Sequence, residues 1–176
     1  MLKVKLPDEV ELRIRLYCSD QDGISEAGFF DFEDLATKRA NHGFVWLHLS
    51  GSFGEEFWKH LYDFLDLTTE QVKLLRSPHK DSFSEDFHNG IFWTLARPSI
   101  TENVDAIETI NFFMAEKVLI TRQFSHDNAF AFVSHKLMEK GRRFSDVTVD
   151  RLAAILIEEI INSYVELLKL GGTKLE

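Results

Sequence analysis

The segment from Val149 to Leu170 constrains the fold more than any other, because it reads as one long helix that is apolar around more than half of its circumference. At 100° per residue its polar positions fall within an arc of about 140°. They are Glu158, Glu159, Asn162, Ser163, Glu166 and Lys169. The pattern predicts that one side of the helix packs on its own domain and the other on a second surface, either a partner chain or a continuation of this one. An ordinary core helix in a thick domain is the alternative.

Length and composition favour one packed domain over residues 1–176. A chain of 176 residues buries a sizeable core without disulfides or a structural metal. Aromatic residues make up 12% of it, whereas Gly (9) and Pro (3) are scarce, which argues against disorder and against a turn-rich sandwich.

The net charge, the single cysteine and the N-terminal residues indicate the kind of ligand and the compartment. The formal net charge of -9 makes nucleic acid an unfavourable ligand and cations favourable ones. Cys18 is the single cysteine, so no internal disulfide forms, and no apolar signal core follows Met1. The longest apolar window is interrupted by Glu158 and Glu159, short of the roughly 18 apolar residues that a membrane span needs. We expect a soluble, cytoplasmic polypeptide.

Hydrophobic periodicity predicts strands mixed with helices. The first half is expected to hold a strand at Val10–Tyr17 near a sheet edge, followed by a strand at Ile24–Phe29, a helix from Asp31 or Asp34 to Asn41, a strand at Phe44–Leu49, and helices at Phe53–Asp66 and Glu70–Leu75. The second half is expected to hold strands at Ile91–Leu95, Thr109–Ala115 and Val118–Arg122, a helix at Asp127–Lys140 and the long last helix. This order predicts an α/β fold, an α/β/α layered domain whose mixed, partly antiparallel sheet is covered by helices on both faces.

The chain carries no recognisable enzyme signature. It lacks a nucleophile elbow, a phosphate-binding loop and a dinucleotide fingerprint, so we expect neither catalysis nor a required cofactor. None of the seven histidines pairs at the spacing of helical zinc sites, and His48 is expected to be a hydrogen-bonded, half-buried strand residue. Asp81, Glu85 and Asp86 form the densest acidic cluster with His88, in a predicted loop that either holds a hard cation or is simply solvated.

Several segments taken together resemble one family, the cytoplasmic domain of CorA-type divalent-cation transporters, and within it the ZntB zinc-transporter branch. The resemblance rests on the succession Phe44–Leu49 with the helix after it, Glu85–Leu95, Ile110–Phe113 followed by Val118–Thr121, and the closing helix with Tyr164 and Leu175-Glu176. It implies an α/β/α domain, a homopentamer around a funnel of long helices, and two membrane helices beyond the last residue that place the full-length protein in the inner membrane. The apolar side of the last helix would then face a pore-lining helix outside this sequence.

Three departures accompany this resemblance. The Gly-Met-Asn motif of the pore mouth has no counterpart, so the chain is expected not to conduct ions alone. Lys73 and Leu74 stand where magnesium-sensing members carry an acidic pair, and Asn162 replaces the second of two acids on the last helix, of which Glu158 matches the first.

The resulting functional hypothesis is a regulatory and assembly domain of a transporter for divalent cations such as Mg²⁺ or Zn²⁺. Candidate cation ligands near the expected interface are Asp146, Asp150, Glu158 and Glu159, followed by Asp81, Glu85 and Asp86. The alternative is a free-standing, non-enzymatic module that oligomerises through its last helix.

Overall fold

The strand β3 (Val45–Ser50) is an interior strand of the sheet, and its side chains alternate between two cores. Val45, Leu47 and Leu49 enter one hydrophobic cluster, whereas Trp46 enters the other. All six residues of β3 are buried, as expected for a strand covered on both faces. The alternation predicted from the sequence is therefore confirmed.

The computed structural model describes residues 13–20, 23–27, 32–41, 43–98, 107–125, 128–139 and 147–172. In this part of the chain one seven-stranded sheet has the order β2-β1-β3-β7-β6-β5-β4. Its other strands are β1 (Arg13–Asp20), β2 (Gly23–Ala27), β4 (Phe83–Phe87), β5 (Gly90–Pro98), β6 (Ile107–Ala115) and β7 (Val118–Gln123). Only β3 and β7 pair in parallel, and the other neighbours are antiparallel, so the sheet is mixed as predicted.

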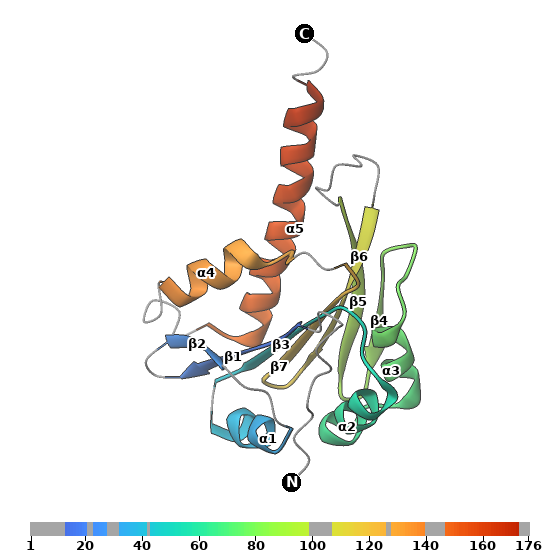
Figure 1. Ribbon diagram of the computed structural model, residues 1–176, viewed down its shortest axis with the longest axis vertical. Helices are drawn as coiled ribbons and strands as arrows, with labels where there is room; N and C mark the ends of the chain where they lie inside the picture. The colour runs from blue at the N-terminus through green and yellow to red at the C-terminus, as the bar shows by residue number, and fades with distance from the viewer. Residues whose placement is uncertain are drawn as a thin grey trace.

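Helices cover both faces of this sheet (Figure 1). One face carries α1 (Phe32–Asn41), α2 (Glu55–Leu65) and α3 (Thr69–Arg76). The opposite face carries α4 (Ala131–Glu139) and α5 (Val149–Gly172). This arrangement confirms the predicted α/β/α layers.

One prediction about the sheet edges is confirmed and another was wrong. The first strand lies near an edge, as predicted, since only β2 stands outside it in the described sheet. At the other edge, β4 occupies the segment that was expected to be a loop. Its residues are largely exposed and include Glu85 and Asp86, so an edge strand of this kind lacks the apolar alternation by which buried strands are found.

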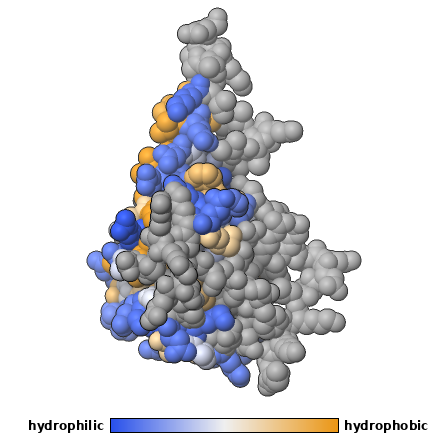
Figure 2. Space-filling view, turned by 90° about the vertical axis from the view of Figure 1, so that its left-hand side faces the viewer, coloured by the Kyte–Doolittle hydropathy of each residue, from blue (hydrophilic) through white to orange (hydrophobic). Residues whose placement is uncertain are grey.

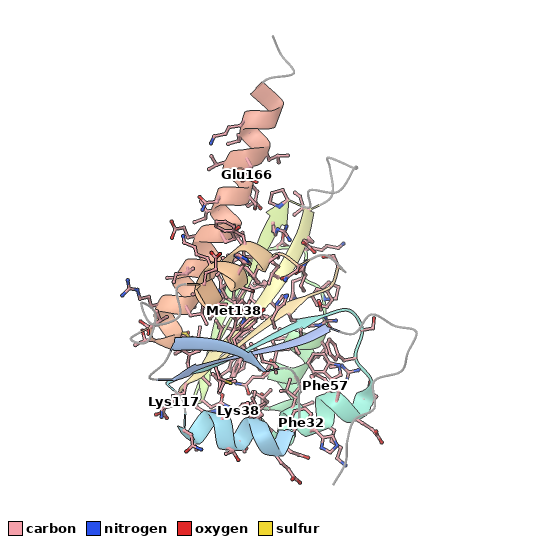
Figure 3. All side chains as sticks on the ribbon, turned by 60° about the vertical axis from the view of Figure 1, so that its left-hand side comes forward. Phe32, Lys38, Phe57, Lys117, Met138 and Glu166 are labelled. Carbon is pink, nitrogen blue, oxygen red and sulfur yellow. The ribbon has the colours of Figure 1, made fainter. Side chains whose placement is uncertain are left out.

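Aromatic packing and one buried amide fix the helices of the first face. Phe32 of α1 lies against Phe57 of α2 with ring centroids 5.6 Å apart (Figure 3). Asn111 in β6 is fully buried, and its Nδ2 donates to the carbonyls of Leu74 (2.9 Å) and Ser77 (2.8 Å), where α3 ends. The sheet thus holds the carbonyl end of α3 directly.

The backbone of β5 comes very close to β6 where the β4–β5 hairpin turns. The turn at His88-Asn89, as predicted, leads into Gly90. A Cβ at Gly90 would lie 2.5 Å from the carbonyl oxygen of Met114 and 2.8 Å from the ring of Phe113. Only glycine leaves room for β6 at this point.

Candidate functional site

The helix α5 extends well beyond the sheet (Figure 1). Near the sheet it buries Leu152, Leu156 and Ile160 in the second core. Further along, Ile161 is 57% exposed and Leu168 is 75% exposed. The apolar side of the helix is therefore divided into a buried face and an exposed face, as its excess of apolar residues predicted.

The polar side of α5 faces α4. Glu158, Glu159 and Asn162 line a groove of about 220 Å³, with Phe132 and Lys136 of α4 on its other wall. A wider hollow of about 500 Å³ adjoins it and is lined by Glu166 and Lys169 of α5 (Figure 3 labels Glu166). Ser163 is the exception on this side, since it is buried and its Oγ donates to the carbonyl of Ile160 at 2.6 Å.

Two carboxyl groups of α5 have shifted pKa values. Burial raises the pKa of Glu159, with a further contribution from the negative charge of Glu166, and the nearby cations of Lys136 and Arg97 only partly oppose this. At the start of the helix, a hydrogen bond from Thr148 lowers the pKa of Asp150. Glu159 therefore holds a proton more readily than an ordinary exposed glutamate.

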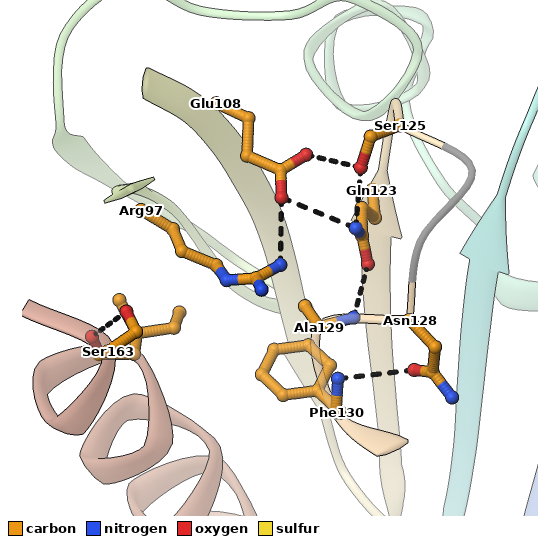
Figure 4. Close-up of polar contacts among 9 residues, drawn as sticks. Arg97, Glu108, Gln123, Ser125, Asn128, Ala129, Phe130 and Ser163 are labelled. Carbon is orange, nitrogen blue, oxygen red and sulfur yellow. Dashed lines mark hydrogen bonds and ion pairs between the residues drawn. The ribbon is translucent and has the colours of Figure 1, made fainter. Parts of the chain in front are cut away.

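A polar network connects the ends of three strands with the segment that enters α4 (Figure 4). Glu108 accepts from Arg97 Nη1 at 2.8 Å through Oε1 and from Ser125 Oγ at 2.5 Å through Oε2. Gln123 donates to Glu108 at 3.3 Å and accepts from the backbone N–H of Ala129 at 3.0 Å. The network fixes the start of α4, and therefore one wall of the groove.

Sequence reasoning missed this network. The one signal available was the polar pair Gln123 and Ser125, which follow the predicted strand Val118–Arg122. Polar side chains often gather at the carboxyl end of a strand. Their partners, Arg97 and Glu108, come from the β5–β6 pair, so the association depends on strand order.

The predicted cation ligands lie in two separate regions of the chain. Asp150 is in the first turn of α5, and Glu158 and Glu159 follow on the same helix, whereas Asp146 lies outside the described residues. Asp81 precedes the edge strand β4, which contains Glu85 and Asp86. Within the ranges that the structure describes, no three His, Cys, Asp or Glu side chains are grouped so that they could hold a metal ion. A site shared between copies stays a prediction.

His48 is more buried than predicted. Its exposed fraction is 1%, and its Nδ1 lies 2.8 Å from Thr121 Oγ1. Trp46 Nε1 donates to the same oxygen at 2.9 Å, so the Thr121 hydroxyl bonds both rings. The predicted hydrogen bond is confirmed. The half-buried position was wrong, because the ring of Phe130, the residue just before α4, covers His48 with its centroid 5.5 Å from the imidazole.

Among the described residues, no helix combines the length and the hydropathy that crossing a bilayer requires.

Solved structures share this fold, although no family model and no curated protein matches the sequence. The soluble domain of CorA from Methanocaldococcus jannaschii aligns with a TM-score of 0.71 and 14% identity, over 94% of this chain and 62% of that one. The complete CorA magnesium transporter of the same organism aligns with a TM-score of 0.71 and 13% identity, over 92% of this chain and 48% of that one. The cytoplasmic domain of ZntB from Vibrio parahaemolyticus aligns with a TM-score of 0.68 and 11% identity, over 94% of this chain and 65% of that one.

These comparisons define the class of fold. The chain has the fold of the soluble domain of CorA-like and ZntB-like proteins, which confirms the resemblance found in the sequence at the level of structure. It spans between about half and two thirds of the length of these solved chains.

Proposed function

We propose that this chain is the cytoplasmic domain of an inner-membrane transporter for divalent cations, acting in regulation and assembly rather than in catalysis. The observation that carries the proposal is a fold shared over 94% of the chain with both a CorA soluble domain and a ZntB cytoplasmic domain. The cation is Mg²⁺ or Zn²⁺, and the assembly is a homo-oligomer, a pentamer in the full-length protein.

Electrostatics support a role near a cation pathway. The net charge of -9 raises the local concentration of cations around the domain. Glu158, Glu159 and Glu166 present carboxylates along the part of α5 that leaves the sheet. Because no three ligands are grouped among the described residues of one copy, a regulatory cation would take carboxylates from two neighbouring copies.

The test is cation-dependent association of the purified chain. Sedimentation velocity with EDTA, with Mg²⁺ and with Zn²⁺ is expected to show a shift of the oligomer distribution on addition of one cation. The double variant Glu158→Gln, Glu159→Gln is expected to lose that shift. The matched control is Glu56→Gln with Glu70→Gln, because these exposed carboxylates lie on α2 and α3 at the opposite face of the sheet. A distribution that no cation changes would contradict cation-regulated assembly.

One further observation favours the alternative function, a module that only self-associates. The exposed apolar face of α5, with Leu168 75% exposed, suits a free-standing module that only self-associates. The reading frame distinguishes the two functions. The transporter requires the frame to continue beyond Glu176 into two apolar segments of about 20 residues each, and the module requires it to stop nearby.

A further inference from the structure

Exposed apolar side chains occur on the projecting helix and also at one edge of the sheet. Figure 2 shows hydrophobic surface along one margin of the projecting part of α5, beside hydrophilic residues. On the sheet, Phe83 of β4 is 37% exposed and Ile91 of β5 is 40% exposed. No described strand lies beyond β4, which forms the edge itself (Figure 1).

The strand β4 turns part of its backbone away from the sheet. The turn His88-Asn89 closes on the pair Phe87–Gly90, and the pair that closes a two-residue turn is a hydrogen-bonded one. Bonded and non-bonded pairs alternate along an antiparallel ladder. The backbone N–H and C=O groups of Ser84 and Asp86 therefore point outward from the edge. These are the groups that an added strand would bond.

An independent contact agrees with this assignment. The backbone N–H of Ala96 in β5 donates to Ser82 Oγ at 3.1 Å, so it points toward the β4 side. Alternate residues of a strand point their N–H groups the same way, so Thr94 also bonds toward β4, at its register partner Phe83. Phe83 is thus in a bonded pair and its neighbour Ser84 is not.

An apolar groove begins at this edge. It measures about 590 Å³, and Ser84, Ile91 and Trp93 contribute to its sheet side while Ala154 and Ile157 of α5 contribute the wall beside it. Ser84 is the register partner of Trp93 and shares its face of the sheet. Because the serine side chain is small, an apolar side chain on a strand next to β4 can extend over it toward the groove.

The charge of the edge selects among partners. Asp81, Glu85 and Asp86 follow closely in the sequence, and alternation places Asp86 on the face of Ser84 and Glu85 on the opposite face. A second copy of β4 laid along this edge would set carboxylates against carboxylates, which disfavours pairing between copies. A strand with basic residues at these positions forms attractive cross-strand pairs on both faces instead.

We propose that the β4 edge binds an extended, basic segment of another protein by strand addition. The added strand exchanges main-chain hydrogen bonds with Ser84 and Asp86. It places an apolar side chain opposite Ser84, at the groove, and basic side chains opposite Glu85 and Asp86. The interaction requires neither a cation nor assembly of copies, so it is tested in EDTA, independently of the proposed transport function.

The probe is the peptide acetyl-Thr-Lys-Lys-Leu-Thr-amide. In an antiparallel register its leucine lies opposite Ser84, and its two lysines lie opposite Asp86 and Glu85. Titration into the ¹⁵N-labelled chain is expected to shift the amide signals of β4 saturably, with a dissociation constant between about 0.01 and 1 mM. An edge that its charges merely protect would give no saturable shift up to about 5 mM, and this result would overturn the proposal.

Two modified peptides distinguish strand addition from simple attraction of charges. N-methylation of the leucine removes an N–H that would face β4, and it is expected to weaken binding at least about tenfold. N-methylation of the second lysine removes an N–H that would face solvent, so binding should change less than about threefold. Equal effects of the two modifications would overturn strand addition.

Matched variants of the chain test the edge itself. Glu85→Lys with Asp86→Lys is expected to weaken binding of the probe at least about tenfold. The control, Glu56→Lys with Glu70→Lys, makes the same change of net charge on α2 and α3 and should leave the affinity almost unchanged. Equal losses for the two pairs of substitutions would assign the binding to net charge and overturn the proposal.

One further variant removes a backbone donor without changing the charge. Ser84→Pro lacks the outward N–H and is expected to abolish binding, whereas Ser84→Ala retains it and should bind the probe. The sheet tolerates proline at this position because the Ser84 N–H does not bond β5. Circular dichroism checks that each variant folds, and a folded Ser84→Pro protein that binds like the wild type would contradict the proposed register.

Discussion

Trp46 and Thr121 are joined across the only parallel strand pair in the described sheet, where the indole Nε1 donates to the Thr121 hydroxyl at 2.9 Å. The same hydroxyl lies 2.8 Å from His48 Nδ1, so one oxygen satisfies two buried rings from the neighbouring strand. A buried polar group that loses its partner retains the full cost of desolvation.

Thr121→Val is therefore expected to destabilise the fold by about 2–4 kcal/mol, because it leaves the Trp46 N–H and His48 Nδ1 without this partner. Urea unfolding followed by tryptophan fluorescence measures the change. Thr121→Ser retains the hydroxyl and loses one methyl group, so its cost is expected to be only about 1 kcal/mol. Equal costs for the two variants would show that the hydroxyl is unimportant.

Asn111→Ala is expected to cost about 1–3 kcal/mol, because the carbonyls of Leu74 and Ser77 lose their buried donor. Asn111→Asp is expected to cost at least as much, since a carboxylate opposite two carbonyl oxygens adds repulsion to the loss. Hydrogen exchange of α3 is the more specific measurement. The amides of α3 should lose more protection than the amides of the interior strands. An equal loss of protection across the domain would contradict a local role.

Gly90→Ala is expected to destabilise the protein by about 1–3 kcal/mol, because the added methyl group would meet the Met114 carbonyl oxygen at 2.5 Å. Chemical denaturation gives the free energy of unfolding. A loss well below about 1 kcal/mol would mean that β5 and β6 separate easily at this point.

Gly54→Ser is expected to stabilise the protein by about 0.5–1 kcal/mol. Gly54 is the N-cap of α2 and has extended backbone angles, nothing lies within 4 Å of a Cβ built there, and no side chain caps the helix. A serine Oγ can accept from a free N–H of the first turn. Gly54→Ala restricts the unfolded backbone to the same extent but has no acceptor oxygen. Its melting temperature should therefore be lower than that of Gly54→Ser.

Glu159→Gln is expected to raise the melting temperature at pH 7 and to have little effect at pH 4. The folded-state pKa of Glu159 lies above its ordinary value of 4.5, so the ionised carboxyl destabilises the fold at pH values above the folded-state pKa. As the pH falls through 4.5, the group is protonated in both states and the penalty disappears. Thermal scans at the two pH values measure the difference, with Glu116→Gln on an exposed turn as the control. A stabilisation equal at both pH values would exclude ionisation as its cause.

Sequence reasoning succeeded where burial on one or two faces imposes a regular period. The alternation of Val45, Leu47 and Leu49 with Trp46 and His48 identified β3 as a buried strand. The period of α5 identified both its length and its two-sided character. It failed at β4, where exposed polar residues leave no period to detect.

The sequence by itself therefore determined the helices and strands other than β4, because local periodicity reflects burial directly. It also determined that α5 has more apolar surface than one sheet face can cover. Only the tertiary structure decided which side of α5 remains exposed, that the groove beside it lies over β5, and that Arg97, Glu108 and Gln123 form one network. These relationships join residues far apart in the chain. They depend on strand order and on the path of α5 across the sheet, which no local pattern contains.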